Sequence, residues 1–121
     1  MLILIADDEQ NVRLLVRKLL GDRYIVLEAA DGEAAIDMAR EFKPALILLD
    51  ILMPKMSGYA ALRAIKTDAV TQGIPVVMLT GLGTELDKGL AKQMGADGYI
   101  TKPFSLQDLK KTIDRLVKSP E

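Results

Sequence analysis

The sequence contains no cysteine, no histidine and no tryptophan. Without cysteine, the chain has no disulfide, no thiolate metal site and no cysteine nucleophile. Without histidine, it has no imidazole base and cannot carry a phosphohistidine, so any phosphoryl donor must be another molecule. Aromatic residues make up only 4% of the chain. A buried core must therefore consist of aliphatic side chains.

Long hydrophobic runs and a surplus of one charge are also missing. No stretch approaches the roughly 18 apolar residues of a membrane span. The apolar start at residues 1–6 is too short, and lacks the basic flank, to be a signal peptide. We therefore expect a cytoplasmic protein without membrane contact. The net charge is −1, with acids and bases interspersed, which gives no footprint for direct nucleic-acid binding.

What is present predicts a single α/β domain over residues 1–121. Half of the residues are hydrophobic and 27% are charged, an ordinary globular composition. Short apolar or β-rich segments alternate with segments of helical periodicity. Strands are expected at 2–6, 24–28, 45–49, 74–79 and 98–101. Helical stripes cover 12–20, 35–42, 61–65, 86–94 and 106–117.

Several residues mark the ends of these helices. Gly21 and Gly95 are placed to close the first and the fourth helix, and the second must end before Pro44. Ser105 and Asp108 have the spacing of a capping box at the start of the last one.

This alternation indicates a parallel sheet covered by helices on both faces. Right-handed crossovers leave few topologies. We expect a flavodoxin-like, doubly wound sheet of five strands in the order 2-1-3-4-5, with five flanking helices.

Polar residues follow four of the expected strands. Asp7 and Asp8 follow the first, Asp50 the third, Thr80 the fourth and Lys102 the fifth. In a parallel sheet these carboxyl ends share one edge, where ligands of open α/β sheets bind. Two carboxylates about 4–5 Å apart repel by roughly 3–4 kcal/mol at an effective dielectric near 20, and one lysine cannot neutralise three. Either a carboxyl pKa rises strongly or a hard divalent cation binds.

An all-oxygen site with few protein ligands favours Mg²⁺, which often shares its shell with a phosphate. Together with Mg²⁺, Thr80 and Lys102 would hold three phosphoryl oxygens around Asp50. An aspartate that forms an acyl phosphate is a known nucleophile, and the surrounding cations would stabilise the transferring group.

The chain resembles the response regulator receiver domain family from end to end. The resemblance rests on Asp7-Asp8, on the segment DILMPKMSG at 50–58, on Thr80 and on the segment YITKPF at 99–104. It implies that Asp50 is the phosphoacceptor. It also implies that Asp50 binds Mg²⁺ together with three further ligands: Asp8 directly, Asp7 mainly through water, and the backbone carbonyl of Leu52.

The same resemblance assigns a switch and a set of partners. Thr80 matches the hydroxyl that turns toward the phosphate, and Tyr99 the aromatic residue whose rotamer follows it. Lys102 matches the phosphate-binding lysine, and the bond from Lys102 to Pro103 is expected to be cis. Before phosphorylation we expect Thr80 turned away and Tyr99 outward. The donor is expected to be a sensor histidine kinase or a histidine phosphotransfer protein. The signal passes to an output domain or partner protein, and the chain itself is not an enzyme.

Two other functions on a similar fold fit the residues less well. A phosphohydrolase of the haloacid dehalogenase type has a second acid two residues after the nucleophile, where this chain has Leu52. A flavin carrier would have a Ser/Thr-rich loop after the first strand, where this chain has acids. A receiver-like scaffold that is never phosphorylated stays open.

In the family, the region that corresponds to 85–117 often carries the signal to partners. One branch of transcriptional regulators dimerises there through ion pairs. Lys88 and Asp108 fit that pattern, but Gly98, Thr112 and Ser119 replace its other charged residues. We therefore do not expect that dimer. The two positions that tune the phosphoryl lifetime, Leu52 and Leu82, are apolar, which predicts slow self-dephosphorylation.

Overall fold

The computed structural model describes residues 1–117, so Ser119 and the rest of the tail lie outside the described residues. The strands are β1 (Leu2–Ala6), β2 (Ile25–Ala29), β3 (Leu46–Leu49), β4 (Val76–Thr80) and β5 (Gly98–Thr101). The helices are α1 (Gln10–Leu20), α2 (Gly32–Phe42), α3 (Gly58–Thr67), α4 (Glu85–Gln93) and α5 (Leu106–Leu116). Within this described part, no helix is both long and apolar enough to traverse a bilayer.

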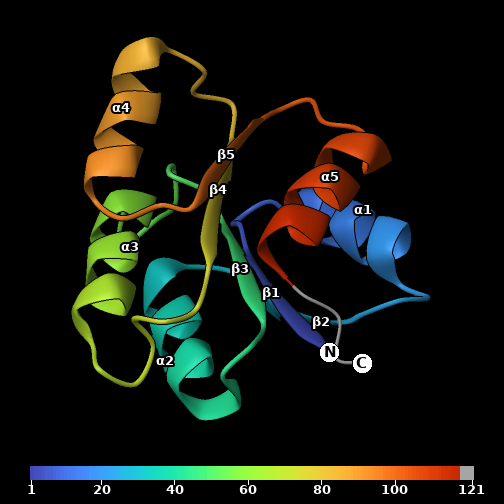
Figure 1. Cartoon of the computed structure of the whole chain (residues 1–121), viewed down its shortest axis with the longest axis horizontal. Helices are drawn as coiled ribbons and strands as arrows, with labels where there is room; N and C mark the ends of the chain where they lie inside the picture. Colours follow the sequence, from blue (N-terminus) through green and yellow to red (C-terminus); the bar gives the residue numbers. More distant parts are fainter. Residues whose placement is uncertain (118–121) are drawn as a thin grey trace.

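All neighbouring strands are parallel, and their order is β2-β1-β3-β4-β5. Helices α2, α3 and α4 cover one face of the sheet, and α1 and α5 cover the other (Figure 1). The predicted doubly wound fold and its strand order are therefore confirmed.

Alternation along the central strands explains why they are apolar throughout. In β1, Leu4 packs in the core on the side of α2 and α3, whereas Ile3 and Ile5 pack in the core on the side of α1 and α5. The residues of β3 and β4 alternate between the two cores in the same way. Because successive side chains of a strand point to opposite faces, burial on both faces requires continuous apolar runs.

The element boundaries differ from the sequence expectation in places with a clear physical cause. Strand β4 begins at Val76 rather than residue 74, because Pro75 has no N–H to donate to the ladder. At its other end β4 extends one residue further than expected, so that Thr80 is its last residue. Gly21 caps α1 in a right-handed conformation, whereas Gly95 has a φ of 102° just beyond α4. The capping box of Ser105 and Asp108 is present at the start of α5.

Candidate functional site

The acidic residues Asp7 and Asp50 lie side by side at the carboxyl edge of the sheet. Strands β1 and β3 are neighbours with Ala6 opposite Leu49, so the residues that follow them meet. The Asp50 N–H continues the pairing by donating to the Ala6 carbonyl at 2.9 Å. Together with Asp8, these residues place one carboxylate oxygen each within 4.8 Å of one another.

The three acids differ in their exposure. Asp7 and Asp50 are buried, and Asp8 is exposed. Burial raises the pKa of Asp7, and the charge of Asp50 raises it further. The hydrogen bonds from Lys102 and from the Glu9 N–H counteract only part of this rise. The fold therefore holds Asp7 where its ionised form is disfavoured, which is the situation that a bound cation relieves.

Lys102 is the cation that the protein itself brings to this edge. Its Nζ lies 2.7 Å from Asp7 Oδ2, 3.3 Å from Asp50 Oδ2 and 3.7 Å from Glu9 Oε1. Burial alone would lower the pKa of Lys102, but the hydrogen bonds and charges of the two aspartates outweigh it, and the pKa is raised. The backbone of Lys102 is anchored by its N–H to the Thr80 carbonyl at 2.8 Å, and the bond to Pro103 is cis.

One oxygen of the cluster has no partner. Asp50 Oδ2 accepts from Lys102, but Asp50 Oδ1 is buried and, alone among the buried side-chain polar atoms of residues 1–117, makes no hydrogen bond. Such an orphaned atom is costly in a native protein and calls for an explanation. The donor set of three carboxylates beside one ammonium fits a hard divalent cation with oxygen ligands, which is the chemistry of Mg²⁺.

The loop after Asp50 is shaped by close backbone packing. The Gly58 N–H donates to the Ile51 carbonyl at 2.7 Å, and a Cβ at Gly58 would lie 2.0 Å from the Asp50 carbonyl oxygen. Lys55 has a φ of 68° in a tight turn in which the Met56 N–H donates to the Pro54 carbonyl. Gly58 thus lets the loop fold back against the residue that the sequence singles out as the nucleophile.

Leu52 lies in this loop and is 62% exposed. Its side chain takes no part in the acidic cluster. The use of its backbone carbonyl as a metal ligand stays a prediction.

Thr80 and Tyr99 both contact Leu82 in the loop between β4 and α4. Thr80 is fully buried, and its Oγ1 accepts from the Leu82 N–H at 3.4 Å. The Tyr99 hydroxyl donates to the Leu82 carbonyl, and the ring is half-buried. Burial raises the pKa of Tyr99, and the charges of Asp87 and Asp50 add to the rise. The expectation that Tyr99 points outward is wrong for this structure, because the carbonyl offers its hydroxyl a partner inside the fold.

Sequence reasoning missed a basic residue that supports the acidic pair. Arg13 on α1 donates through Nη1 to the Asp7 carbonyl at 2.7 Å and through Nε to Glu28 at 3.0 Å. Arg17, one turn further along α1, also pairs with Glu28. The sequence feature that could have predicted these ion pairs is a glutamate in an otherwise apolar strand, combined with two arginines four residues apart.

A second missed group holds the first turn of α4. The Tyr59 hydroxyl on α3 donates to Asp87 Oδ1 at 2.9 Å, and the Thr84 hydroxyl donates to Asp87 Oδ2 at 2.5 Å. Tyr59 and Tyr99 therefore bind the β4–α4 loop and its helix from two different elements.

The fold and the acidic edge define a class, the doubly wound α/β proteins with a polar site at the carboxyl ends of their strands. Within this class, the chain belongs to the response regulator receiver domain family, whose sequence profile matches residues 3–114. Proteins of this family are the receivers of two-component systems, in which they work with histidine kinases and output domains.

Individual relatives agree with this assignment. The chain is 38% identical over 120 residues to a probable transcriptional regulator, ycf27 of Cyanophora paradoxa, and the match covers 98% of the chain and 49% of that protein. The chain thus spans about half the length of such a curated relative.

Two solved structures resemble the whole fold. One is the chemotaxis protein CheY4 of Vibrio cholerae, with a TM-score of 0.90, 32% identity, and coverage of 96% of this chain and 98% of that one. The other is the receiver domain of the sensor histidine kinase PA1611 of Pseudomonas aeruginosa PAO1, with a TM-score of 0.89, 28% identity and 98% of both chains covered. The PA1611 structure has a magnesium ion coordinated in its active-site cleft.

Proposed function

We propose that this chain is a single receiver domain over residues 1–121 that accepts a phosphoryl group on Asp50. The donor is a phosphohistidine on a sensor histidine kinase or on a histidine phosphotransfer protein, since this chain has no histidine of its own. The observation that carries the proposal is the unpartnered Oδ1 of Asp50, a buried oxygen without a hydrogen bond at the edge where ligands bind. A free carboxylate oxygen is what an aspartyl nucleophile requires.

In the transfer, Asp50 Oδ1 attacks the phosphorus, the bond from phosphorus to the histidine nitrogen breaks, and an acyl phosphate forms. Asp7, Asp8, Asp50 and the Leu52 carbonyl would hold Mg²⁺, which supplies positive charge to the phosphoryl oxygens when bound. Arg13 fixes the backbone of Asp7 through its carbonyl.

Lys102 and Thr80 are the remaining groups that stabilise the negative charge of the incoming phosphoryl group. The Lys102 ammonium, 3.3 Å from Asp50 Oδ2, donates to a phosphoryl oxygen. Thr80 Oγ1 has only a long contact of 3.4 Å from the Leu82 N–H, so its hydroxyl can turn to a better acceptor. A phosphoryl group offers such acceptors together with added negative charge.

Movement of Thr80 would change the β4–α4 loop, because Leu82 contacts both Thr80 and Tyr99. We propose that this coupling shifts the population of two conformations at the face formed by α4, β5 and α5. An output domain or partner protein reads that face. The chain acts as a regulatory acceptor rather than an enzyme with its own substrate, works in the cytoplasm, and itself contacts neither membrane nor nucleic acid.

We expect the acyl phosphate to be long-lived, because the side chains of Leu52 and Leu82 cannot orient an attacking water. Replacing them in the double variant Leu52→Asn, Leu82→Glu should accelerate phosphoryl loss, which is measured as the decay of the phosphorylated mass after the donor is removed. An unchanged decay rate would show that these positions do not set the lifetime.

The proposal is tested by mixing the protein with Mg²⁺ and acetyl phosphate and measuring the intact mass. We expect a phosphoryl increment that needs Mg²⁺ and is absent in Asp50→Asn. An increment that persists in Asp50→Asn would move the acceptor to another residue. If there is no increment, and beryllofluoride also fails to bind in the presence of Mg²⁺, the acceptor function is wrong.

A further inference from the structure

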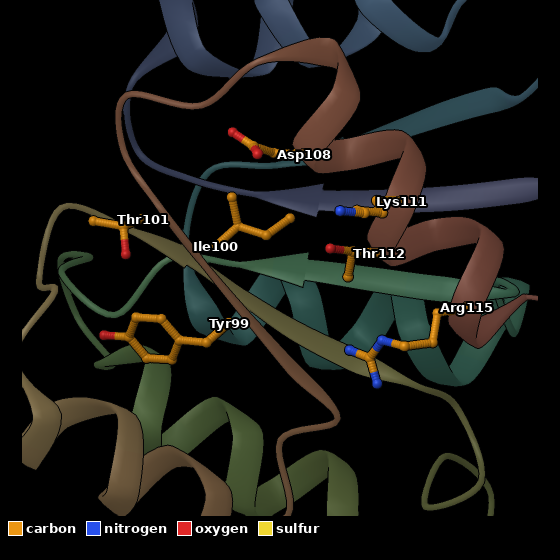
Figure 2. Close-up of a pocket in the computed structure, with 7 residues that line it drawn as sticks. All are labelled: Tyr99, Ile100, Thr101, Asp108, Lys111, Thr112 and Arg115. Atoms are coloured by element: carbon orange, nitrogen blue, oxygen red, sulfur yellow. The ribbon is translucent and has the colours of Figure 1, made fainter.

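The described sheet has two edge strands, β5 at one end and β2 at the other. Strand β5 borders a hollow of about 500 Å³ between β5 and α5 (Figure 2), on the face that the proposed function assigns to the output partner. The edge of β2 lies at the other end of the sheet (Figure 1), and the proposed function assigns no role to it. An edge strand is a place where a strand of another molecule can pair.

Every second residue of β2 directs its backbone groups away from β1. The Ile25 N–H donates to the Met1 carbonyl at 3.0 Å, so Ile25 and the alternate residues after it face β1. The intervening residues Val26 and Glu28 direct their N–H and carbonyl groups to the free edge. Strand β2 therefore has the backbone groups with which a further strand would pair.

The sequence of β2 also favours such pairing. Residues 24–27, with the sequence YIVL, are aromatic or aliphatic and include no proline. An uncharged segment of high β propensity at an edge is typical of strands that pair between molecules. Ile25 is 62% exposed at this edge, and Glu28 is the first charged residue after the run. A strand of this composition needs protection if the chain is to stay monomeric.

Arg17 on α1 covers the outward-facing backbone of Val26. Its Nη2 donates to the Val26 carbonyl at 3.1 Å and to Glu28 Oε2 at 2.7 Å. Val26 is only 4% exposed, although it belongs to an edge strand. The guanidinium thus occupies the place that the N–H of an additional strand would take.

Glu28 holds the guanidinium in this place and is itself held by a second arginine. Glu28 Oε2 also accepts from Arg17 Nε at 3.0 Å, and Glu28 Oε1 accepts from Arg13 Nε at 3.0 Å. Burial raises the pKa of Glu28, but the hydrogen bonds and charges of Arg17 and Arg13 outweigh it, and the pKa is lowered. Two arginines that share one carboxylate form a network, which keeps its geometry better than an isolated surface pair.

We propose that Arg17 closes the free edge of β2 against strand pairing with a second copy of this chain. A second copy fits this edge because β2 is complementary to itself in an antiparallel arrangement. The outward-facing residues Val26 and Glu28 lie symmetrically about Leu27, so a two-fold axis at Leu27 would place Val26 of one copy opposite Glu28 of the other. No like charges would then lie directly opposite each other. The guanidinium on the Val26 carbonyl is therefore the obstacle to pairing, and this role does not depend on phosphorylation of Asp50.

Sedimentation velocity over a series of concentrations measures the self-association of the full chain. Arg17→Ala removes the guanidinium. Arg17→Lys keeps the charge but lacks the planar fork that contacts the Val26 carbonyl and Glu28 together, and it serves as the test variant if circular dichroism shows that Arg17→Ala is unfolded. Lys18→Ala, at the next exposed position of α1, also removes a positive charge and is the matched control.

A cysteine identifies the face through which two copies associate, because the chain has no cysteine of its own. Leu27→Cys places a thiol at the expected two-fold axis, where opposed Cα atoms would be about 4.5 Å apart, a separation that a disulfide can bridge. Lys92→Cys, at an exposed position of α4, is the control thiol. Mild oxidation followed by electrophoresis without reductant detects the cross-linked dimer.

We expect Arg17→Ala to lower the dissociation constant of the dimer at least about tenfold, the factor for one backbone hydrogen bond made available. Arg17→Lys should lower it about threefold, and Lys18→Ala should change it less than about twofold. Leu27→Cys should cross-link at least about tenfold faster when Arg17 is replaced by alanine, whereas cross-linking of Lys92→Cys should not change.

The proposal is overturned if the folded Arg17 variants associate no more strongly than the wild type or Lys18→Ala. It is also overturned if Arg17→Ala associates while the cross-linking of Leu27→Cys stays the same, because the copies would then meet through another face. Cross-linking of Lys92→Cys that rises in place of that of Leu27→Cys would have the same meaning.

Discussion

Two lysine–aspartate pairs occupy opposite ends of the sheet, and they differ in how well their charges are matched. At the amino ends of β4 and β5, Lys66 Nζ lies 2.8 Å from Asp97 Oδ2 and 2.8 Å from the Ile74 carbonyl. The same Asp97 oxygen also accepts from the Val76 N–H. One cation thus faces one carboxylate, and the pair ties α3 to the starts of two strands.

At the carboxyl edge, one cation faces a surplus of acids. Lys102 contacts Asp7, Asp50 and Glu9, Asp8 adds a further carboxylate to the cluster, and one oxygen of Asp50 has no partner.

The contrast separates a structural ion pair from a binding site. Buried polar groups that are fully hydrogen-bonded rigidify a fold, whereas partly satisfied ones are costly. A divalent cation bound among the acids would remove this cost. We therefore assign stability to the Lys66 end and ligand binding to the Lys102 end.

The largest effect is expected for Gly58→Ala. The added Cβ would lie 2.0 Å from the Asp50 carbonyl oxygen, so the backbone of the acidic edge must move. We expect a loss of about 3 kcal/mol in the free energy of unfolding, the upper range of overpacking, together with reduced phosphoryl uptake. Urea unfolding and intact mass measure the two effects. Gly73→Ala, where a Cβ meets nothing within 4 Å, is the control, and equal stability of the two variants would refute the packing argument.

Lys66→Met tests the matched end. It leaves Asp97 and the Ile74 carbonyl without their cation and, because the ion pair is partly exposed, should cost about 1 kcal/mol of unfolding free energy. The cost should be the same with and without Mg²⁺, and phosphoryl uptake should be unchanged. Lys110→Met, on the surface of α5, should stay within about 0.5 kcal/mol of the wild type. If Lys66→Met abolished uptake instead, the division between the two ends would fail.

Asp7→Asn tests the acid-rich carboxyl edge of the sheet. Here we expect the opposite effect on stability. It removes a buried charge that lies beside Asp50, so the Mg²⁺-free protein should gain about 1 kcal/mol in stability. The further stabilisation that Mg²⁺ gives to the wild type should be lost. Asp37 is an exposed residue on α2, and Asp37→Asn should change neither the stability without Mg²⁺ nor the stabilisation by Mg²⁺. If Asp7→Asn were less stable than the wild type in Mg²⁺-free buffer, the charges of the acidic cluster would already be compensated without the metal.

The smallest effect concerns the pH dependence of Tyr59. Burial, followed by the hydrogen bond and charge of Asp87, raises the pKa of Tyr59 from 10.0 to about 12. Because the folded protein favours the protonated hydroxyl, its contribution is full below pH 10 and is lost as the pH rises toward about 12. Tyr59→Phe should therefore be about 1 kcal/mol less stable than the wild type near pH 8, and this gap should narrow above pH 10. A gap of the same size near pH 8 and near pH 11 would contradict the assignment.

The sequence was sufficient to predict the order of the strands and the residues at their ends. Continuous apolar runs identify buried parallel strands, and the parallel arrangement then brings Asp7, Asp50 and Lys102 to one edge whatever the details of packing. The capping box at Ser105 could be predicted because it depends on residues only three positions apart.

The features of the site that the sequence did not predict depend on contacts between elements that are distant in sequence. The closeness of Gly58 to the Asp50 carbonyl, the bond from Arg13 to the Asp7 carbonyl and the pairing of Tyr59 with Asp87 follow from how helices are placed on the sheet. The orientation of Tyr99 was predicted wrongly, because the deciding partner is a backbone carbonyl of a loop, which no side-chain pattern reveals.

The central claim is that the unmatched carboxyl edge takes up Mg²⁺ and a phosphoryl group at Asp50. Fluorine NMR of the protein with beryllofluoride, recorded with and without Mg²⁺, tests this most directly. We expect signals of bound beryllofluoride that require Mg²⁺ and are missing in Asp50→Asn. Bound signals that persist in Asp50→Asn, or their absence from the wild type in the presence of Mg²⁺, would contradict it.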